Sequence, residues 1–123
     1  MLFRSNDNNN TSDVFLYDRT TGLLEVISKT SSSATGSGAS DHCSVSDDGR
    51  YVAFASDASN LIAIDSNGYR DIFVRDRQTA VTTRASVNSG GVQADYTSDL
   101  PSISGDGHYI TFVSGADNLV VAT

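Results

Sequence analysis

The sequence is poor in the residues that form disulfides, thiolate metal sites and membrane spans. Its 123 residues include one cysteine, Cys43, one proline, Pro101, and no tryptophan. A single cysteine excludes an intrachain disulfide and a zinc site built from several thiolates. No apolar run approaches the roughly 18–20 residues of a transmembrane helix. The N-terminal stretch MLFRSNDNNN also lacks the apolar core of a signal peptide, so these residues predict no export signal.

Positive charge is scarce as well. Eight Lys and Arg residues stand against 15 Asp and Glu residues, which gives a formal net charge of −7. A surface of this sign repels nucleic-acid phosphates and anionic lipids, so we expect no nucleic-acid partner and no membrane partner. Hydrophobic residues make up 38% of the chain, which lies above the disordered range and suffices for one modest domain.

The chain contains an internal repeat. The segment SDDGRYVAFAS (46–56) reappears as SGDGHYITFVS (104–114), and DVFLYDRTTG (13–22) reappears as DIFVRDRQTA (71–80). The offset is 58 residues in both cases, from Ser46 to Ser104 and from Asp13 to Asp71, and the chain aligns with itself at this offset without a gap. We therefore interpret residues 1–123 as one domain with a repeat unit of about 58 residues, divided into 1–58 and 59–123.

The hydrophobic pattern within the unit predicts β-strands. In the segment 71–77, Ile72 and Val74 point to one face and Phe73 points to the other, which is the two-residue period of a strand. Apolar residues on both faces predict that both faces of the sheet are covered. No segment has helical periodicity. Similar reasoning predicts the other strands at 13–17, 23–28, 42–46, 51–56, 81–87, 100–104 and 109–114.

Two kinds of turn connect these strands. The pairs Asp48–Gly49 and Asp106–Gly107 lie between extended segments and predict hairpins with type I′ turns, which need the positive φ that glycine adopts readily. The pairs Asp18–Arg19 and Asp76–Arg77 end the third strand of each copy, and we expect them to fix the next turn or to bridge sheets. The fold class is therefore all-β, with four antiparallel strands a, b, c and d per unit and the chain order c–d, a–b–c–d, a–b.

The repeated pattern resembles a known family. SxDGRYVAF followed by DIFVRDR is similar to the WD-like repeats of TolB-type β-propellers, and residues 46–54, 71–76, 104–112 and 13–18 carry this similarity. The resemblance implies β-propeller blades of four antiparallel strands, with two blade equivalents in the chain and a periplasmic or secreted location. It also implies a non-enzymatic scaffold that binds a protein or small ligand, with strand a near the axis so that His42 lines the channel.

Two blade equivalents are fewer than the four to eight blades of a propeller. Strands a–b at one end of a chain can complete strands c–d of the next copy in a head-to-tail ring, which removes unpaired edges. Three chains then give six blades, the number in TolB-type propellers. We expect a homo-oligomer, with a trimer favoured. The alternative, that the chain is a piece of a larger propeller, stays open.

A calcium-binding structural repeat is the alternative function. The segment before strand c resembles a short calcium loop, in which oxygen ligands alternate and glycine takes the sixth position. With Gly68 in that position, Ala63 replaces the first ligand and Val74 replaces the final glutamate. The same side chains are also suited to capping their own turn. The candidate calcium ligands are Asp65, Asn67 and Asp71 in one copy and Asp7, Asn9 and Asp13 in the other.

The segment SDHCS (40–44) raises the question of catalysis. Neighbours on a strand face opposite sides, so His42 and Cys43 are not expected to pair as base and nucleophile. Their counterparts in the other copy are Leu100 and Pro101, which have no acid–base chemistry. An enzyme with a channel site would need several acidic or histidine residues on strand a. We therefore expect no enzyme and no catalytic residues, and we expect His108, which follows the second Asp-Gly turn, to be exposed to solvent.

Overall fold

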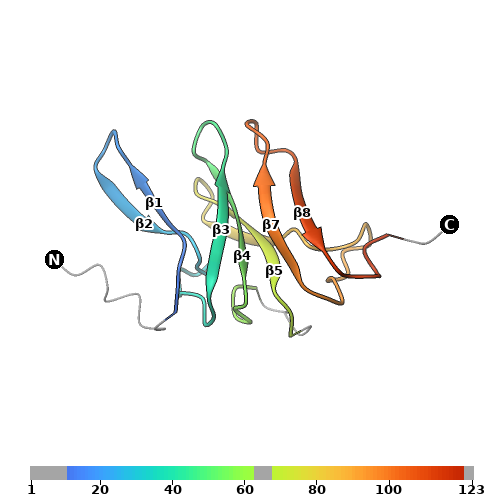
Figure 1. The fold of residues 1–123 in the computed structure, drawn as a ribbon. Coiled ribbons are helices and arrows are strands. Elements are labelled where there is room, and N and C mark those ends of the chain that lie inside the picture. The colour runs from blue at the N-terminus through green and yellow to red at the C-terminus, as the bar shows by residue number, and fades with distance from the viewer. Residues whose placement is uncertain (1–10, 63–67, 121–123) are drawn as a thin grey trace.

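The structure is a computed structural model, and it describes residues 11–62 and 68–120. Within these ranges the chain is all-β, as predicted, with antiparallel strands and no helix (Figure 1). The absence of helices there also means that no membrane-spanning helix is found in the described part. The strands are β1 (Phe15–Asp18), β2 (Leu23–Val26), β3 (Ser40–Val45), β4 (Tyr51–Ser56), β5 (Asp71–Asp76), β6 (Val81–Arg84), β7 (Ser98–Ile103) and β8 (Ile110–Ser114).

The strands form three antiparallel sheets. β1 pairs with β2, the middle sheet has the order β3–β4–β5–β6, and β7 pairs with β8. The three sheets stand side by side in sequence order, with the hairpins β1–β2 and β7–β8 on opposite sides of the middle sheet (Figure 1). The described strands close into no barrel or ring within one chain. Within each sheet, the strands that pair are therefore consecutive in the chain. Neighbouring sheets contact each other through their faces.

The Asp-Gly pairs lie in hairpins, as predicted, but the expected type I′ turn is wrong, because Asp48 and Asp106 lack the positive φ that it needs. Gly49 and Gly107 have φ values of 75° and 78°, which L-residues rarely adopt. In the first turn the Ser46 hydroxyl donates to Asp48 Oδ1 at 2.8 Å and accepts from the Tyr51 amide at 3.1 Å. The corresponding hydroxyl of the β7–β8 turn makes the same two contacts. The turn aspartates are thus bound by their own hairpins.

Strands β3 and β7 differ from the prediction in where they begin and in their regularity. β3 and β7 begin two residues earlier than predicted, and each is interrupted by a β-bulge, between Asp41 and Ser44 in β3 and between Asp99 and Ser102 in β7. A bulge inserts extra residues on one strand and turns their side chains away from strict alternation. His42 accordingly has a positive φ of 47°. His42 nevertheless contacts Asp99 of β7, whereas Cys43 lines a pocket with residues of β1, so the two side chains face different neighbours, as predicted.

The hydrophobic core lies against one face of the middle sheet. Phe54 of β4 and Phe73 of β5 are fully buried directly opposite each other, with ring centroids 5.8 Å apart. Such an offset aromatic pair adds to the stability gained by removing apolar surface from water. Residues from β4, the β1–β2 unit and the loop after β4 complete this cluster: Val14, Ile27, Val52, Ala58 and Leu61.

The other face of the middle sheet is covered by β7. Ala53 and Ala55 of β4 and Ile72 of β5 are fully buried there, and β7 contacts both strands. Small alanine side chains let the neighbouring backbone approach closely, because they occupy little space above the sheet. Both faces of the middle sheet are therefore covered, as its two-sided apolar pattern predicts.

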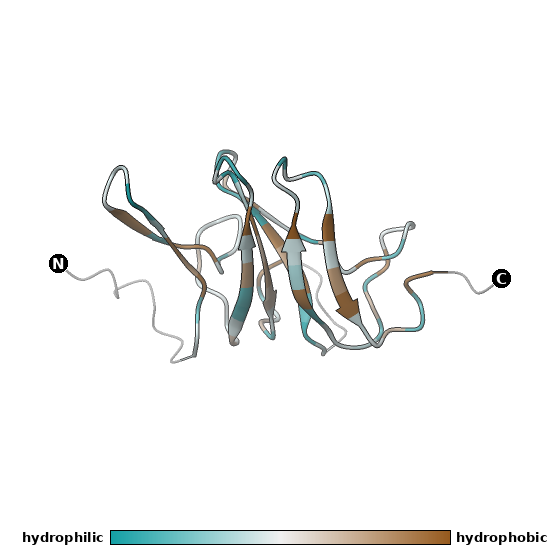
Figure 2. Cartoon of the chain, turned by 45° about the horizontal axis from the view of Figure 1, so that its top comes forward, coloured by the Kyte–Doolittle hydropathy of each residue, from teal (hydrophilic) through white to brown (hydrophobic). Residues whose placement is uncertain are grey.

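The terminal hairpins do not follow this prediction. In β1, the side chains of Phe15 and Tyr17 are exposed while those of Leu16 and Asp18 are half-buried. In β8, Thr111 and Val113 are exposed. Figure 2 shows apolar residues along these hairpins as well as along the middle sheet. The expected cover of both faces is wrong for the terminal hairpins, because no other described sheet packs on their outer faces.

Candidate functional site

Charged side chains from several segments meet beside β3 and β7. Nδ1 of His42 lies 2.9 Å from Oδ1 of Asp99 and 3.2 Å from Oδ1 of Asp41. Arg70 lies just before β5, and its guanidinium donates to the Asp41 carboxylate. Its Nε lies 3.3 Å from Asp99 Oδ1. The guanidinium also lies 3.3 Å from a carboxylate oxygen of Asp57, after β4. We call these five residues the Arg70 network.

The bulges of β3 and β7 bring this network together. Asp41 and Asp99 occupy the same position in the two repeat copies, 58 residues apart, and each is the last regularly paired residue before its bulge. The positive φ of His42 turns its ring toward Asp99 on the neighbouring strand. Sequence reasoning singled out His42 but missed Asp99 and Arg70. The equal spacing of Asp41 and Asp99 was the available signal.

The Arg70 network is an ion-pair cluster with one polar face open to solvent. Arg70 is largely buried, whereas about half of each of the His42 and Asp41 side chains is exposed. Burial opposes ionisation of Asp99, but hydrogen bonds from the Leu100 amide, His42 and Arg70 outweigh it and lower its pKa. Among the described residues, Asp41, His42 and Asp99 are the group with ligand atoms close enough for a metal ion. Arg70 contacts the carboxylates of Asp41 and Asp99, so its positive charge already balances part of their negative charge.

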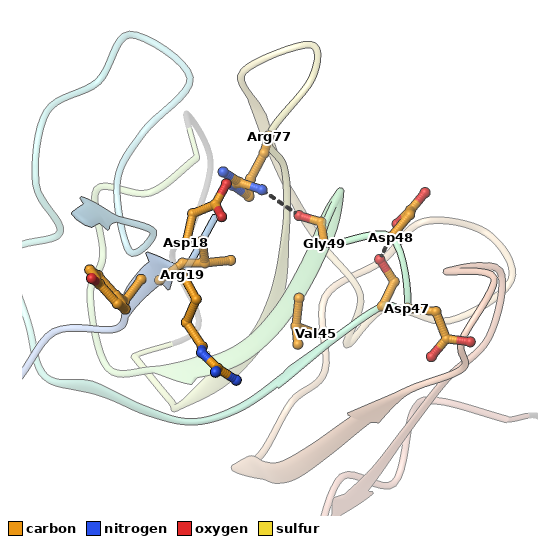
Figure 3. A pocket seen from close by; sticks show the side chains of 10 residues that line it. Asp18, Arg19, Val45, Asp47, Asp48, Gly49 and Arg77 are labelled. Carbon is orange, nitrogen blue, oxygen red and sulfur yellow. Dashed lines mark hydrogen bonds between the residues drawn. The ribbon is translucent and has the colours of Figure 1, made fainter. Parts of the chain in front are cut away.

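A pocket of about 360 Å³ opens between β1 and the β3–β4 turn (Figure 3). Arg77 forms one wall: its Nε donates to Glu25 Oε1 at 2.8 Å, and its Nη1 donates to the Gly49 carbonyl at 2.7 Å. These bonds tie the β1–β2 hairpin to the β3–β4 turn beside the pocket. The charged residues that line it are Asp18, Arg19, Asp47, Asp48 and Arg77.

The Asp76 carboxylate organises the β5–β6 turn. It accepts two hydrogen bonds from Arg50, from Nε and Nη2, each at 2.9 Å, and further bonds from the backbone amides of Gln78 and Thr79. The Asp-Arg pair therefore fixes the turn after strand c and bridges β5 to the β3–β4 hairpin, as expected from the sequence. The bidentate contact with Arg50, supported by these amides, holds the pKa of Asp76 far below its ordinary value of 3.8.

This depressed pKa predicts a pH dependence of stability. A carboxyl group with a lower pKa in the folded chain contributes stability above its unfolded pKa, near 3.8, and loses it as the pH falls below that value. We expect the melting temperature to fall between pH 5 and pH 2, by circular dichroism. The variant Asp76→Asn should melt lower than the wild type at pH 7 and show a smaller fall. An equal fall in both proteins would contradict this role for Asp76.

The structure places two of the six candidate calcium ligands. Asp71 is fully buried at the start of β5, where its Oδ1 accepts from the Ser86 hydroxyl at 2.8 Å and its Oδ2 lies 3.6 Å from Arg84 Nη1. Asp13 accepts from the Ser28 hydroxyl at 2.9 Å in the equivalent arrangement. Both carboxylates thus anchor strand c to strand d. The other candidates lie outside the described residues, so the calcium hypothesis stays a prediction: Asp7, Asn9, Asp65 and Asn67.

Unlike the buried Asp71, the remaining candidates from the sequence lie on the surface. Cys43 is a free, exposed thiol in the β3 bulge, and His108 is exposed beside Asp106, as predicted.

In comparisons with known proteins, no family model and no curated protein matches the chain.

Proposed function

We propose that this chain is a β-propeller repeat module of the TolB type. The four-stranded antiparallel middle sheet, with neighbouring sheets on both faces, supports this proposal, because a propeller blade is a four-stranded sheet packed between two others. On this interpretation β1–β2 is the outer half of a blade and β7–β8 is the inner half of another. The 58-residue repeat from Asp13 to Asp71 and from Ser46 to Ser104 supports the same division.

The proposed activity is binding, without catalysis. In a propeller the innermost strands face the central channel, which would place the Arg70 network at the channel wall. Half-exposed carboxylate and imidazole groups there are suited to hydrogen bonding with a polar protein segment or small ligand. Asp99 is a poor general base, because its lowered pKa weakens its affinity for protons. These groups therefore support recognition better than proton transfer.

The observation that carries the proposal is the pair of free strand edges. Among the described strands, β1 is paired on one side by β2 and β8 on one side by β7, while their counterparts β5 and β4 pair with each other. Free edges of this kind attract another strand. We propose that β8 of one copy and β1 of the next complete a blade, and that three copies close a ring of six blades.

The mass of the folded chain in solution tests this proposal. We expect light scattering coupled to size exclusion to give about 39 kDa, three times the 13.0 kDa of one chain, at micromolar concentrations. A folded chain, verified by its circular dichroism and cooperative melting, that keeps a mass of 13.0 kDa across this range would overturn the ring. A four-bladed dimer of about 26 kDa would retain edge pairing but exclude the trimer.

A further inference from the structure

The β4–β5 pair inside the chain is a template for contact between two copies. These strands pair along their full length, from Tyr51 opposite Asp76 to Ser56 opposite Asp71. At the repeat offset of 58 residues, β4 corresponds to residues 109–114, which contain β8, and β5 corresponds to residues 13–18, which contain β1. We infer that β8 of one copy pairs antiparallel with β1 of the next in this same register, with Phe112 opposite Phe15. This inference rests on the proposed ring and specifies its contact.

The free edges differ in how they are protected against pairing. β1 reads FLYD and β8 reads ITFVS, so neither contains a proline, a lysine or an observed bulge, the features that keep edge strands apart. The innermost edges, which would face the channel, are protected: β3 and β7 each contain a bulge, and β7 also contains Pro101. The two edges that the template pairs are therefore unprotected, unlike the innermost edges. The outermost strands β2 and β6 also lack proline, lysine and an observed bulge, so the repeat template selects the pairing edges.

The exposed apolar side chains fit the same register. Phe15 and Tyr17 lie on one face of β1 and are 47% and 60% exposed, whereas their counterparts Phe73 and Arg75 in the middle sheet are buried. In the inferred pair, Phe15 and Tyr17 would continue the face of β8 that contains Phe112. A shift of one residue would turn them to the opposite face, so burial of this surface selects the register.

A polar contact at the end of the template has a counterpart as well. Arg50 binds Asp76 in the template, and the corresponding residues are His108 and Asp18. In its own chain the His108 imidazole is exposed, with Nδ1 3.1 Å from Asp106 Oδ2. The amides of Thr20 and Thr21 hold the pKa of Asp18 below its ordinary value, so its carboxylate is charged at neutral pH.

In the inferred register His108 therefore faces Asp18 of the next copy, beside Arg19 of that copy. An imidazole offers a single N–H where the Arg50 guanidinium offers two toward one carboxylate, so the contact between copies is weaker than its template. An arginine in place of His108 is therefore expected to strengthen the contact between copies.

Cysteine cross-linking tests the register directly. In the template Ala53 lies opposite Val74, and the corresponding pair is Thr111 and Leu16. In a Cys43→Ser background, we expect the variant Leu16→Cys/Thr111→Cys to form disulfides between copies on mild oxidation, seen as a ladder on a non-reducing gel. The matched control, Leu16→Cys/Val113→Cys, places the thiols two residues out of register on the same face. Diagonal neighbours of this kind lie about 7–8 Å apart between their Cα atoms, beyond the usual Cα–Cα range of a disulfide.

The outcomes separate the register from the ring. A wild-type mass of one chain overturns the ring and the register together. An oligomer in which the in-register variant does not cross-link, or in which the control cross-links as well as it does, overturns the register and leaves the ring standing. Preferential cross-linking of Leu16→Cys/Thr111→Cys supports both. The mass and circular dichroism of each reduced variant verify that assembly and fold are retained before oxidation.

The variant His108→Arg supplies a second measurement that does not depend on new thiols. It copies the Arg50–Asp76 pair into the contact between copies, and it changes an exposed side chain, so the fold of one chain should be unaffected. We expect association to tighten roughly two- to five-fold per contact, measured by dilution in analytical ultracentrifugation. The double variant His108→Arg/Asp18→Asn should lose this gain. Unchanged or weaker association of His108→Arg would contradict the placement of His108 against Asp18.

Discussion

Replacing Phe73 by alanine is expected to lower the free energy of unfolding by about 3–5 kcal/mol. The ring is fully buried in the middle sheet, stacks on Phe54 and belongs to the core cluster that joins this sheet to the β1–β2 unit. Its removal deletes apolar contacts and leaves a cavity that a sheet covered on both faces fills poorly. Domains of this size are stable by about 5–15 kcal/mol, so the variant should be close to unfolding in urea titrations.

Phe15→Ala is the matched control for this substitution, because Phe15 is the counterpart of Phe73 in the other repeat copy and is exposed. Measured at a concentration where the chain is monomeric, this change should cost about 1 kcal/mol or less, since little surface is returned to water. Equal losses for both variants would contradict the described core. Under the proposed ring, Phe15→Ala should instead weaken association between copies.

The strands were predictable because their signals are local. Alternation of Ile72, Phe73 and Val74 marks β5, and the Asp-Gly pair before Tyr51 marks the β3–β4 hairpin, where only the positive φ of Gly49 was needed. The predicted strand 51–56 coincides with β4. Local signals fix the period and the turn, but they contain no information about which face another sheet covers.

The Arg70 network was not predictable from local signals. Arg70 is 29 residues from both Asp41 and Asp99, and the three meet only because β3 and β7 pack side by side. The bulge that turns His42 toward Asp99 contains no glycine, so no residue in the sequence indicates it. The repeat offset between Asp41 and Asp99 identifies equivalent positions, yet packing decides whether equivalent side chains meet or lie apart.

Blocking one free edge is expected to convert the proposed trimer into monomers. The Arg77 amide donates to the Arg50 carbonyl at 2.8 Å, and hydrogen-bonded pairs in an antiparallel ladder recur at every second residue. The amide of Val52 therefore points toward β5, and the amide of Arg75 points toward β4. The counterparts Ile110 and Tyr17 therefore direct their amides to the free edges. Tyr17→Pro removes an outward donor from β1 and Ile110→Pro removes one from the first residue of β8, while the bonds to β2 and β7 remain.

Each proline variant alone should have the 13.0 kDa mass of one chain, because every contact needs one intact edge of each kind. Tyr17→Ala, which keeps the backbone donor, should retain more association than Tyr17→Pro and serves as the control for loss of the side chain. A mixture of Tyr17→Pro and Ile110→Pro should form a heterodimer of about 26 kDa that cannot grow, since it joins the one intact β8 edge to the one intact β1 edge. Trimers in either variant alone, or monomers in the mixture when the wild type is trimeric, would exclude head-to-tail pairing of β8 with β1.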